Sequence, residues 1–179
     1  MESVPAPRDL TRRPATEAEA RALASAIRLR ILRLCLDRAL TNKELAARLG
    51  ANPATVLHHV RKLVATGFLA AQEERRGTRG AREVPYLATG KSWTLDVGDD
   101  KPVAGRGRAM LEAFLDEIRL VDTDHAGLTR LGLRLTEAEL DELRERLFTI
   151  FNEYAGRPPS PDGRPYSLFL ALHEDVSRA

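Results

Sequence analysis

The chain has 179 residues, 43% of them hydrophobic and 30% charged, a composition that can bury a core and that excludes global disorder. A single cysteine, Cys35, excludes a disulfide framework and any zinc site built from several thiolates. The longest apolar run, residues 168–172, is far shorter than the roughly 18 residues of a transmembrane helix. Since the first residues also lack a secretory signal pattern, we expect a cytoplasmic protein without membrane contact.

Charge is unevenly distributed along the chain. Residues 1–90 hold 16 Lys and Arg against 9 Asp and Glu, a net charge of +7, whereas residues 91–179 hold 12 against 17, a net charge of −5. This asymmetry favours a basic N-terminal region that meets polyanions and an acidic C-terminal region with another role.

A proline-containing arm precedes the first helical region. Residues 1–15 contain three prolines and scattered arginines, which indicates a flexible arm. Thr16 and Glu19 form a capping box that starts a helix, and apolar residues at helical spacing continue to residue 36. Ser25 is the point at which this segment could divide into two helices.

Two further helices joined by a tight turn are predicted next. A second capping box, Thr41 with Glu44, starts the first helix, and Gly50 ends it. Asn52 and Pro53 start the second helix as its N-cap and first residue. Its inner face is expected to carry Val56, Val60, Leu63 and Val64. This order of elements is the helix-turn-helix arrangement.

A hairpin with a basic tip follows the second helix. Residues 68–74 and 82–89 favour extended structure, and the segment 75–81 between them holds two glycines and several arginines. Residues 92–97 alternate and predict a possible further strand. The polar segment 98–102 is a linker, and we place a domain boundary there.

The remaining residues predict a helix followed by a β-α-β unit. Residues 103–121 have a helical apolar face, and residues 128–135 alternate as a strand. A third capping box, Thr136 with Glu139, starts a second helix, and residues 166–173 form a predicted strand that is apolar on both faces.

Four segments together resemble ArsR-type winged helix-turn-helix regulators. Residues 22–32 resemble their opening helix, 41–50 the first helix of the motif, 55–63 the recognition helix, and 67–69 the step into the wing. This family comprises bacterial transcriptional regulators, usually homodimers, that bind near-palindromic operators, and many are repressors. The resemblance implies an α+β, mainly α fold: a flexible arm at 1–15, a winged helix-turn-helix DNA-binding domain at 16–97, and a dimerisation or effector-sensing region at 98–179.

The predicted DNA contacts lie on the helix-turn-helix and the wing. Thr55 and His58 offer hydrogen bonds to base edges, and Leu57 suits a thymine methyl. Arg61 and Lys62 suit phosphates, whereas arginines of the wing enter the minor groove or bind flanking phosphates. The full set is Thr41, Lys43, Asn52, Ala54, Thr55, Leu57, His58, His59, Arg61, Lys62, Arg75, Arg76, Arg79 and Arg82. Packing is the alternative for Leu57 and His59, and a solvated hairpin is the alternative for the wing.

A homodimer is expected because two strands alone cannot bury both faces of residues 168–172. The C-terminal region either completes this dimer or also encloses a small-molecule effector. The predicted dimer contacts are Met110, Leu111, Phe114, Leu115, Ile118, Leu168 and Leu170.

Other functional classes have weaker support in the sequence. Cys35 is predicted to be a packing residue, and no metal site or cofactor is expected, although Asp122, Asp124 and His125 provide a metal-responsive alternative. Glycine-rich phosphate loops and hydrolase motifs are absent from the sequence, so an enzyme is not expected. The remaining alternative is a winged helix that binds a partner protein instead of DNA.

Overall fold

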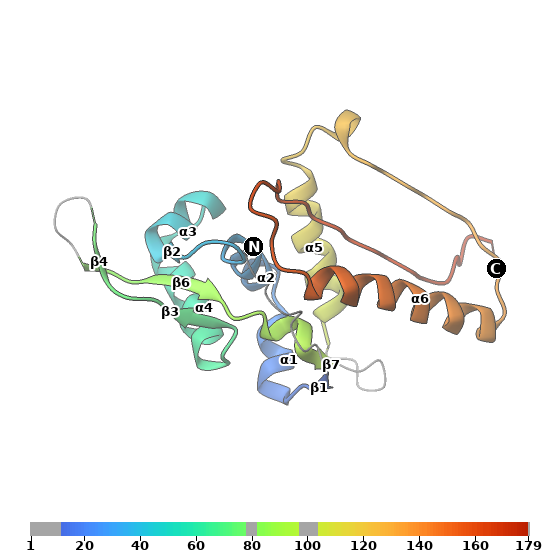
Figure 1. Cartoon of the computed structure of the whole chain (residues 1–179), viewed down its shortest axis with the longest axis horizontal. Coiled ribbons are helices and arrows are strands. Elements are labelled where there is room, and N and C mark those ends of the chain that lie inside the picture. The colour runs from blue at the N-terminus through green and yellow to red at the C-terminus, as the bar shows by residue number, and fades with distance from the viewer. Residues whose placement is uncertain (1–11, 78–81, 97–103, 179) are drawn as a thin grey trace, which may run out of the picture. The chain divides into compact units, whose positions relative to one another are not determined.

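The computed structural model describes residues 12–77, 82–96 and 104–178, which divide into an N-terminal unit, Arg12–Leu120, and a C-terminal unit within Val121–Ala179 (Figure 1). Helices predominate in both units, so the prediction of a mainly α fold is confirmed. Within that described part of the chain, no helix combines the length and apolar character needed to cross a membrane.

The N-terminal unit contains five α-helices and seven short strands among its described residues. The helices are α1 (Glu17–Leu23), α2 (Ala26–Leu34), α3 (Asn42–Leu49), α4 (Pro53–Ala65) and α5 (Arg106–Ile118), with the 3-10 helix η1 (Lys91–Thr94). The strands are β1 (Arg13–Pro14), β2 (Leu40–Thr41), β3 (Leu69–Ala71), β4 (Arg75–Arg76), β5 (Arg82–Glu83), β6 (Pro85–Ala88) and β7 (Leu95–Asp96).

The break that the sequence suggests at Ser25 is confirmed, because α1 ends at Leu23 and Ser25 is the N-cap residue of α2. Arg28 stabilises this break by donating from Nε to the carbonyl of Ala22 at 2.5 Å and from Nη2 to that of Arg21 at 2.8 Å. A cation here satisfies carbonyl groups that the end of α1 leaves without helical partners.

Residues 12–15 differ from the predicted flexible arm. Strand β1 pairs in parallel with β7, and the amide of Ala15 donates to the carbonyl of Asp96 at 2.8 Å. The guanidinium of Arg12 also lies 5.1 Å from the centre of the Trp93 ring. The prediction is wrong here because backbone pairing and a cation–π contact hold these residues, whereas residues 1–11 lie outside the described part of the chain.

The wing is an antiparallel hairpin, as predicted. Strand β6 lies between β2 and β3 and pairs with both, with Ala70 opposite Leu87. Further out, β4 and β5 pair with Arg76 opposite Arg82. The strand predicted at 92–97 is mostly wrong: η1 covers its first residues, and only the two residues of β7 are extended.

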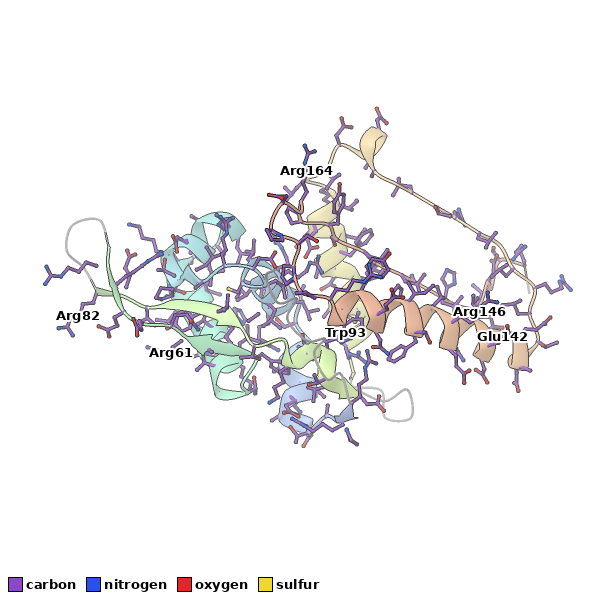
Figure 2. The ribbon with its side chains drawn as sticks, viewed as in Figure 1. Arg61, Arg82, Trp93, Glu142, Arg146 and Arg164 are labelled. Carbon is purple, nitrogen blue, oxygen red and sulfur yellow. The ribbon has the colours of Figure 1, made fainter. Side chains whose placement is uncertain are left out.

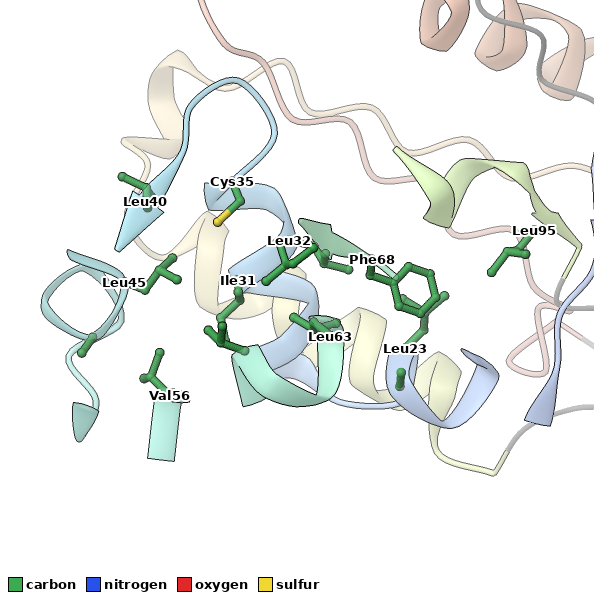
Figure 3. Packing of buried hydrophobic residues seen from close by; sticks show 14 residues of the cluster. Leu23, Ile31, Leu32, Cys35, Leu40, Leu45, Val56, Leu63, Phe68 and Leu95 are labelled. Atoms are coloured by element: carbon green, nitrogen blue, oxygen red, sulfur yellow. The ribbon is translucent and has the colours of Figure 1, made fainter. Parts of the chain in front are cut away.

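One apolar cluster holds the N-terminal unit together (Figure 3). Its buried members are Ala22, Leu23, Ile31, Leu32, Cys35, Leu40, Leu45, Ala46, Val56, Val60, Leu63, Phe68, Leu69 and Leu95. Cys35 is fully buried in this cluster, which confirms the prediction of a packing residue, and burial raises the pKa of its thiol to about 11.

Helix α5 belongs to the N-terminal unit, although the sequence predicts a boundary at residue 98. Arg30 and Arg33 of α2 form ion pairs with Asp116 at 3.2 Å and Glu117 at 3.1 Å. Ala109 and Ala113 are buried on the same helix. Small residues such as these permit close packing of α5 on the unit. The division of the chain therefore falls after Leu120 and not at residue 98.

The C-terminal unit contains the 3-10 helix η2 (Thr123–His125) and the long helix α6 (Glu137–Gly156). The predicted capping box is present at the start of α6: the Thr136 hydroxyl accepts from the Glu139 amide, and the Glu139 carboxylate accepts from the Thr136 amide. The predicted helix in this region is therefore confirmed.

The strands predicted at 128–135 and 166–173 do not form within this chain, because both segments are described and neither pairs with another of its strands. Leu131 and Leu168 are 73% and 74% exposed. An alternating pattern makes a strand only when a neighbouring strand accepts its backbone hydrogen bonds. Arg178, beyond the second segment, donates from its side chain to the carbonyl of Leu133 at 3.0 Å.

Candidate nucleic-acid interface

The angle between α3 and α4 is set by a short turn and two side-chain bonds. Gly50 ends α3 in the left-handed conformation with φ of 61°, which favours glycine. The Asn52 side chain then accepts from the amide of Ala54 at 2.8 Å and caps α4. Asn42, the first residue of α3, donates to the carbonyl of Pro53 at 3.0 Å. These contacts fix the beginning of α4 relative to α3.

Helix α4 has one buried face and one exposed face. Val56, Val60 and Leu63 are fully buried against the core. The opposite face carries Ala54, Thr55, His58, Arg61 and Lys62, all of which are exposed. Figure 2 labels Arg61 among them. Val64, predicted to lie inside, is 38% exposed, because eight residues beyond Val56 it has rotated by about 80° from the buried stripe.

Leu57 and His59 lie at the margins of the exposed face, where both are half-buried. The ring of His59 is 5.6 Å from that of His58, and its Nδ1 atom is buried. Burial, followed by the electrostatic effects of Arg28 and His58, lowers the pKa of His59. A lowered pKa favours the neutral form of the ring over the charged form that would attract a phosphate.

Thr41, Lys43 and Asn52 have different environments. Thr41 is only 3% exposed, and its hydroxyl accepts from the amide of Glu44 at 3.3 Å. Burial and capping give Thr41 a role in starting α3, and its predicted contact with DNA stays a prediction. Lys43, in the first turn of α3, and Asn52, the N-cap of α4, are both exposed.

Two predicted wing arginines already pair with acidic side chains. Arg75 donates from Nη2 to both carboxylate oxygens of Glu44 at 2.9 Å. Arg82 lies 3.6 Å from Glu74 in an exposed pair. Arg76 is exposed, and Arg79 lies outside the described residues. Sequence reasoning missed the Arg75–Glu44 pair, since nothing in the sequence relates two residues 31 positions apart.

Glu44 connects the wing to the helix-turn-helix. Its carboxylate accepts from the Thr41 amide at 2.7 Å while it also binds Arg75. The backbone bond from Thr41 and the charge of Arg75 lower the pKa of Glu44. One carboxylate thus completes the capping box of α3 and anchors strand β4.

The predicted dimer contacts form apolar surface in both units. On α5, Met110, Leu111 and Leu115 are exposed, and Phe114 and Ile118 are half-buried. In the C-terminal unit, Leu168 and Leu170 are both exposed. A single chain thus leaves much of this predicted surface in water.

The residues of the predicted metal alternative lie in η2 and at its N-cap. Asp122 caps η2 by accepting from the amide of Asp124 at 3.2 Å. The side chain of His125 lies outside the described residues, so this alternative stays a prediction. Across the side chains that the structure describes, no group of three or more His, Cys, Asp and Glu residues could hold a metal ion.

An α3–turn–α4 arrangement followed by an antiparallel wing defines a winged helix-turn-helix domain, a class that binds DNA. Residues 23–71 match a family model described as a helix-turn-helix domain. This segment is therefore a helix-turn-helix domain, and the resemblance to ArsR-type regulators is confirmed over the residues that carry it. No curated protein matches the chain in sequence.

Several solved structures are similar to the chain at low identity. HlyU from Vibrio cholerae is 22% identical, with a TM-score of 0.35 over 55% of this chain and 84% of that one. The adhesin competence repressor AdcR from Streptococcus pyogenes is 19% identical, with a TM-score of 0.34 over 73% and 80%. The winged helix-turn-helix domain of Mb0332 from Mycobacterium bovis is 21% identical, with a TM-score of 0.32 over 62% and 82%.

Proposed function

We propose that the protein is a transcriptional repressor that binds an inverted-repeat operator as a homodimer. The observation that carries this proposal is the division of α4 into two faces. Its apolar side chains are buried in the core, while Thr55, His58 and Arg61 face solvent. A recognition helix needs this division, because one face packs on the domain while the other enters the major groove.

Sequence readout and affinity come from different side chains. Thr55 and His58 read base edges, with Leu57 near a thymine methyl. Arg61 and Lys62 lie further along α4 and neutralise phosphates. The position of these two cations favours this division, since they lie toward the end of the helix that leaves the groove.

The wing adds contacts beside the major groove. Arg76 and Arg82 are exposed on neighbouring strands and face the minor groove or the flanking phosphates. Arg75 contributes differently, because its bond to Glu44 holds the base of the wing on α3. We therefore infer that Arg76 and Arg82, and not Arg75, supply the main wing contacts in the described residues.

Dimerisation places two copies of α4 on one operator. The apolar face of α5 and the exposed leucines of residues 166–172 supply surface that a second copy covers. A two-fold dimer sets its recognition helices about 34 Å apart, one turn of DNA, and so prefers an inverted repeat.

Sequencing of the genomic DNA that the purified protein retains tests this proposal. Recovery of a shared inverted repeat is expected, and the genes beside it identify what the protein represses. A salt titration on random duplex DNA tests the rival class, a winged helix that binds a partner protein. Absence of affinity at low salt would support that rival, since a DNA-binding domain binds any duplex through its phosphates.

A further inference from the structure

Helix α1 of the N-terminal unit carries a buried carboxylate. The side chain of Glu19 in α1 is 7% exposed and accepts hydrogen bonds on both oxygens. Arg13 donates to Oε1 at 2.6 Å and to Oε2 at 3.0 Å, and the amide of Thr16 donates to Oε2 at 2.8 Å. The bonds from Arg13 and Lys91, with that from Thr16, hold the pKa of Glu19 well below its usual range.

Lys91 connects this carboxylate to the end of α4. Its Nζ atom lies 2.5 Å from Oε1 of Glu19 and donates to the carbonyl of Thr66, the C-cap residue of α4, at 2.7 Å. The same ammonium group lies 5.3 Å from the centre of the Phe68 ring. A cation is favourable here, because the last carbonyls of a helix carry partial negative charge.

The backbone leaves room for this lysine. Gly67, directly after the C-cap, has φ of 73°, and a Cβ atom added to it would lie 3.3 Å from Nζ of Lys91. Any side chain at position 67 would therefore crowd the ammonium group that binds Thr66. The turn that ends α4 and the position of Lys91 fit each other.

Helix α4 is consequently held at both ends. Asn42 binds the carbonyl of Pro53 at its beginning, and Lys91 binds the carbonyl of Thr66 at its end. The first contact fixes α4 to α3, and the second fixes it to Glu19 of α1. A rotation or shift of the helix would break one of these bonds.

We propose that Lys91, held by Glu19, is a positioning residue that sets how the recognition helix meets the base edges. This inference rests on the proposed function, because it requires that α4 read DNA. Lys91 acts through α4 and not on phosphate: its side chain is 26% exposed, and its ammonium group is directed at Glu19 and Thr66. Lys91 is a cation like Arg61 and Lys62, but it binds groups within the protein, whereas those two residues are proposed to bind phosphates.

The test compares Lys91→Met with the matched variant Lys62→Met. Both remove one lysine charge, but Lys62 is exposed on the outer face of α4. We would measure affinity for the inverted repeat recovered from genomic DNA and for a random duplex, each over a salt series. Lys62→Met should reduce the magnitude of the slope of log K against log salt by about 0.9. It should preserve the preference for the operator.

Lys91→Met should give the opposite pattern. Affinity for the operator should fall at least about fivefold, the low end of the cost of one mismatched base pair, while the random duplex is affected less. The salt slope should stay unchanged, and Lys91→Arg should restore part of the operator preference. Melting curves recorded with each titration establish that the compared proteins are folded.

Several results would overturn the inference. Lys91→Met with an unchanged operator preference, or with a salt slope reduced like that of Lys62→Met, would mean that Lys91 does not position α4. Should Lys91→Met fail to fold, Glu19→Gln keeps the shape of the side chain, removes its charge, and must lower the same preference. A wild-type protein that does not distinguish operator from random duplex would instead contradict the proposed function, and this inference with it.

Discussion

The N-terminal and C-terminal units begin their helices in the same way but bury very different amounts of apolar surface. Thr41 and Thr136 each accept from the amide three residues later at 3.3 Å, in complete capping boxes. Yet the apolar cluster lies wholly within the N-terminal unit, and Gly156 is the single buried residue among those described in the C-terminal unit. Identical local signals therefore start helices equally well with or without a core.

The C-terminal unit exposes much of its apolar surface. Helix α6 exposes Phe148, Ile150 and Tyr154, and the segment 166–173 exposes Leu168 and Leu170. Folding must offset the conformational entropy of ordering these residues, and exposed leucines contribute little to that. The comparison therefore agrees with the proposed dimer, in which a second copy covers this surface.

The largest expected effect is on the free energy of unfolding, which one matched substitution in each unit should change by different amounts. Leu45 is fully buried, so Leu45→Ala should lower the free energy of unfolding by about 2–5 kcal/mol in denaturant titrations. The matched substitution Leu131→Ala, at an exposed site, should change it by less than about 0.5 kcal/mol. Equal losses at the two sites would mean that Leu131 belongs to a core of its own.

The second prediction concerns the surface that we expect the dimer to cover. Leu168→Asp should weaken self-association by about 1.5–3 kcal/mol, since a leucine buried between copies is replaced by a charge. Val176→Asp, at another exposed apolar site outside the predicted contact, is the control. Sedimentation over a concentration series measures both, and a monomeric wild-type protein at micromolar concentration would disprove the dimer.

Two exposed histidines, one in each unit, test where sequence is read. His58→Ala should cost about 1–3 kcal/mol of binding free energy on the operator and much less on random duplex DNA. His173→Ala, in the C-terminal unit, should leave both affinities unchanged. Equal losses on operator and random DNA for His58→Ala would exclude a base-reading role for this residue.

The smallest expected effect is on the salt dependence of DNA binding, measured after one charge is removed from each unit. Arg76→Ala should reduce the magnitude of the salt slope by about 0.9 if Arg76 neutralises a phosphate. If it enters the minor groove instead, affinity should fall most on A/T-rich flanking DNA.

Glu142→Gln is the control for this measurement. Glu142 pairs with Arg146 on α6 at 3.4 Å (Figure 2). Because we expect the acidic unit to face away from the duplex, beyond a Debye length of about 10 Å, the salt slope should not change. An unchanged slope for Arg76→Ala as well would leave the recognition helix as the main source of contacts.

The sequence by itself determined the helix starts, the helix-turn-helix and most of the inner face of α4. Thr16, Thr41 and Thr136 cap helices whose third residue is a glutamate, and Gly50 ends α3 as predicted. These features depend on residues three or four positions apart, so the spacing of residue types is enough to specify them.

Only the tertiary structure decided which charged residues face inward and which extended segments become strands. Lys91 lies 72 positions from Glu19 in the sequence numbering, and Arg75 lies 31 from Glu44, yet each pair is in contact. Residues 13–14 form a strand because β7 pairs with them, whereas residues 166–173 do not, because no strand of the described chain pairs with those. The partner of such a residue depends on how the helices pack. The neighbouring residues in the sequence therefore do not reveal that partner.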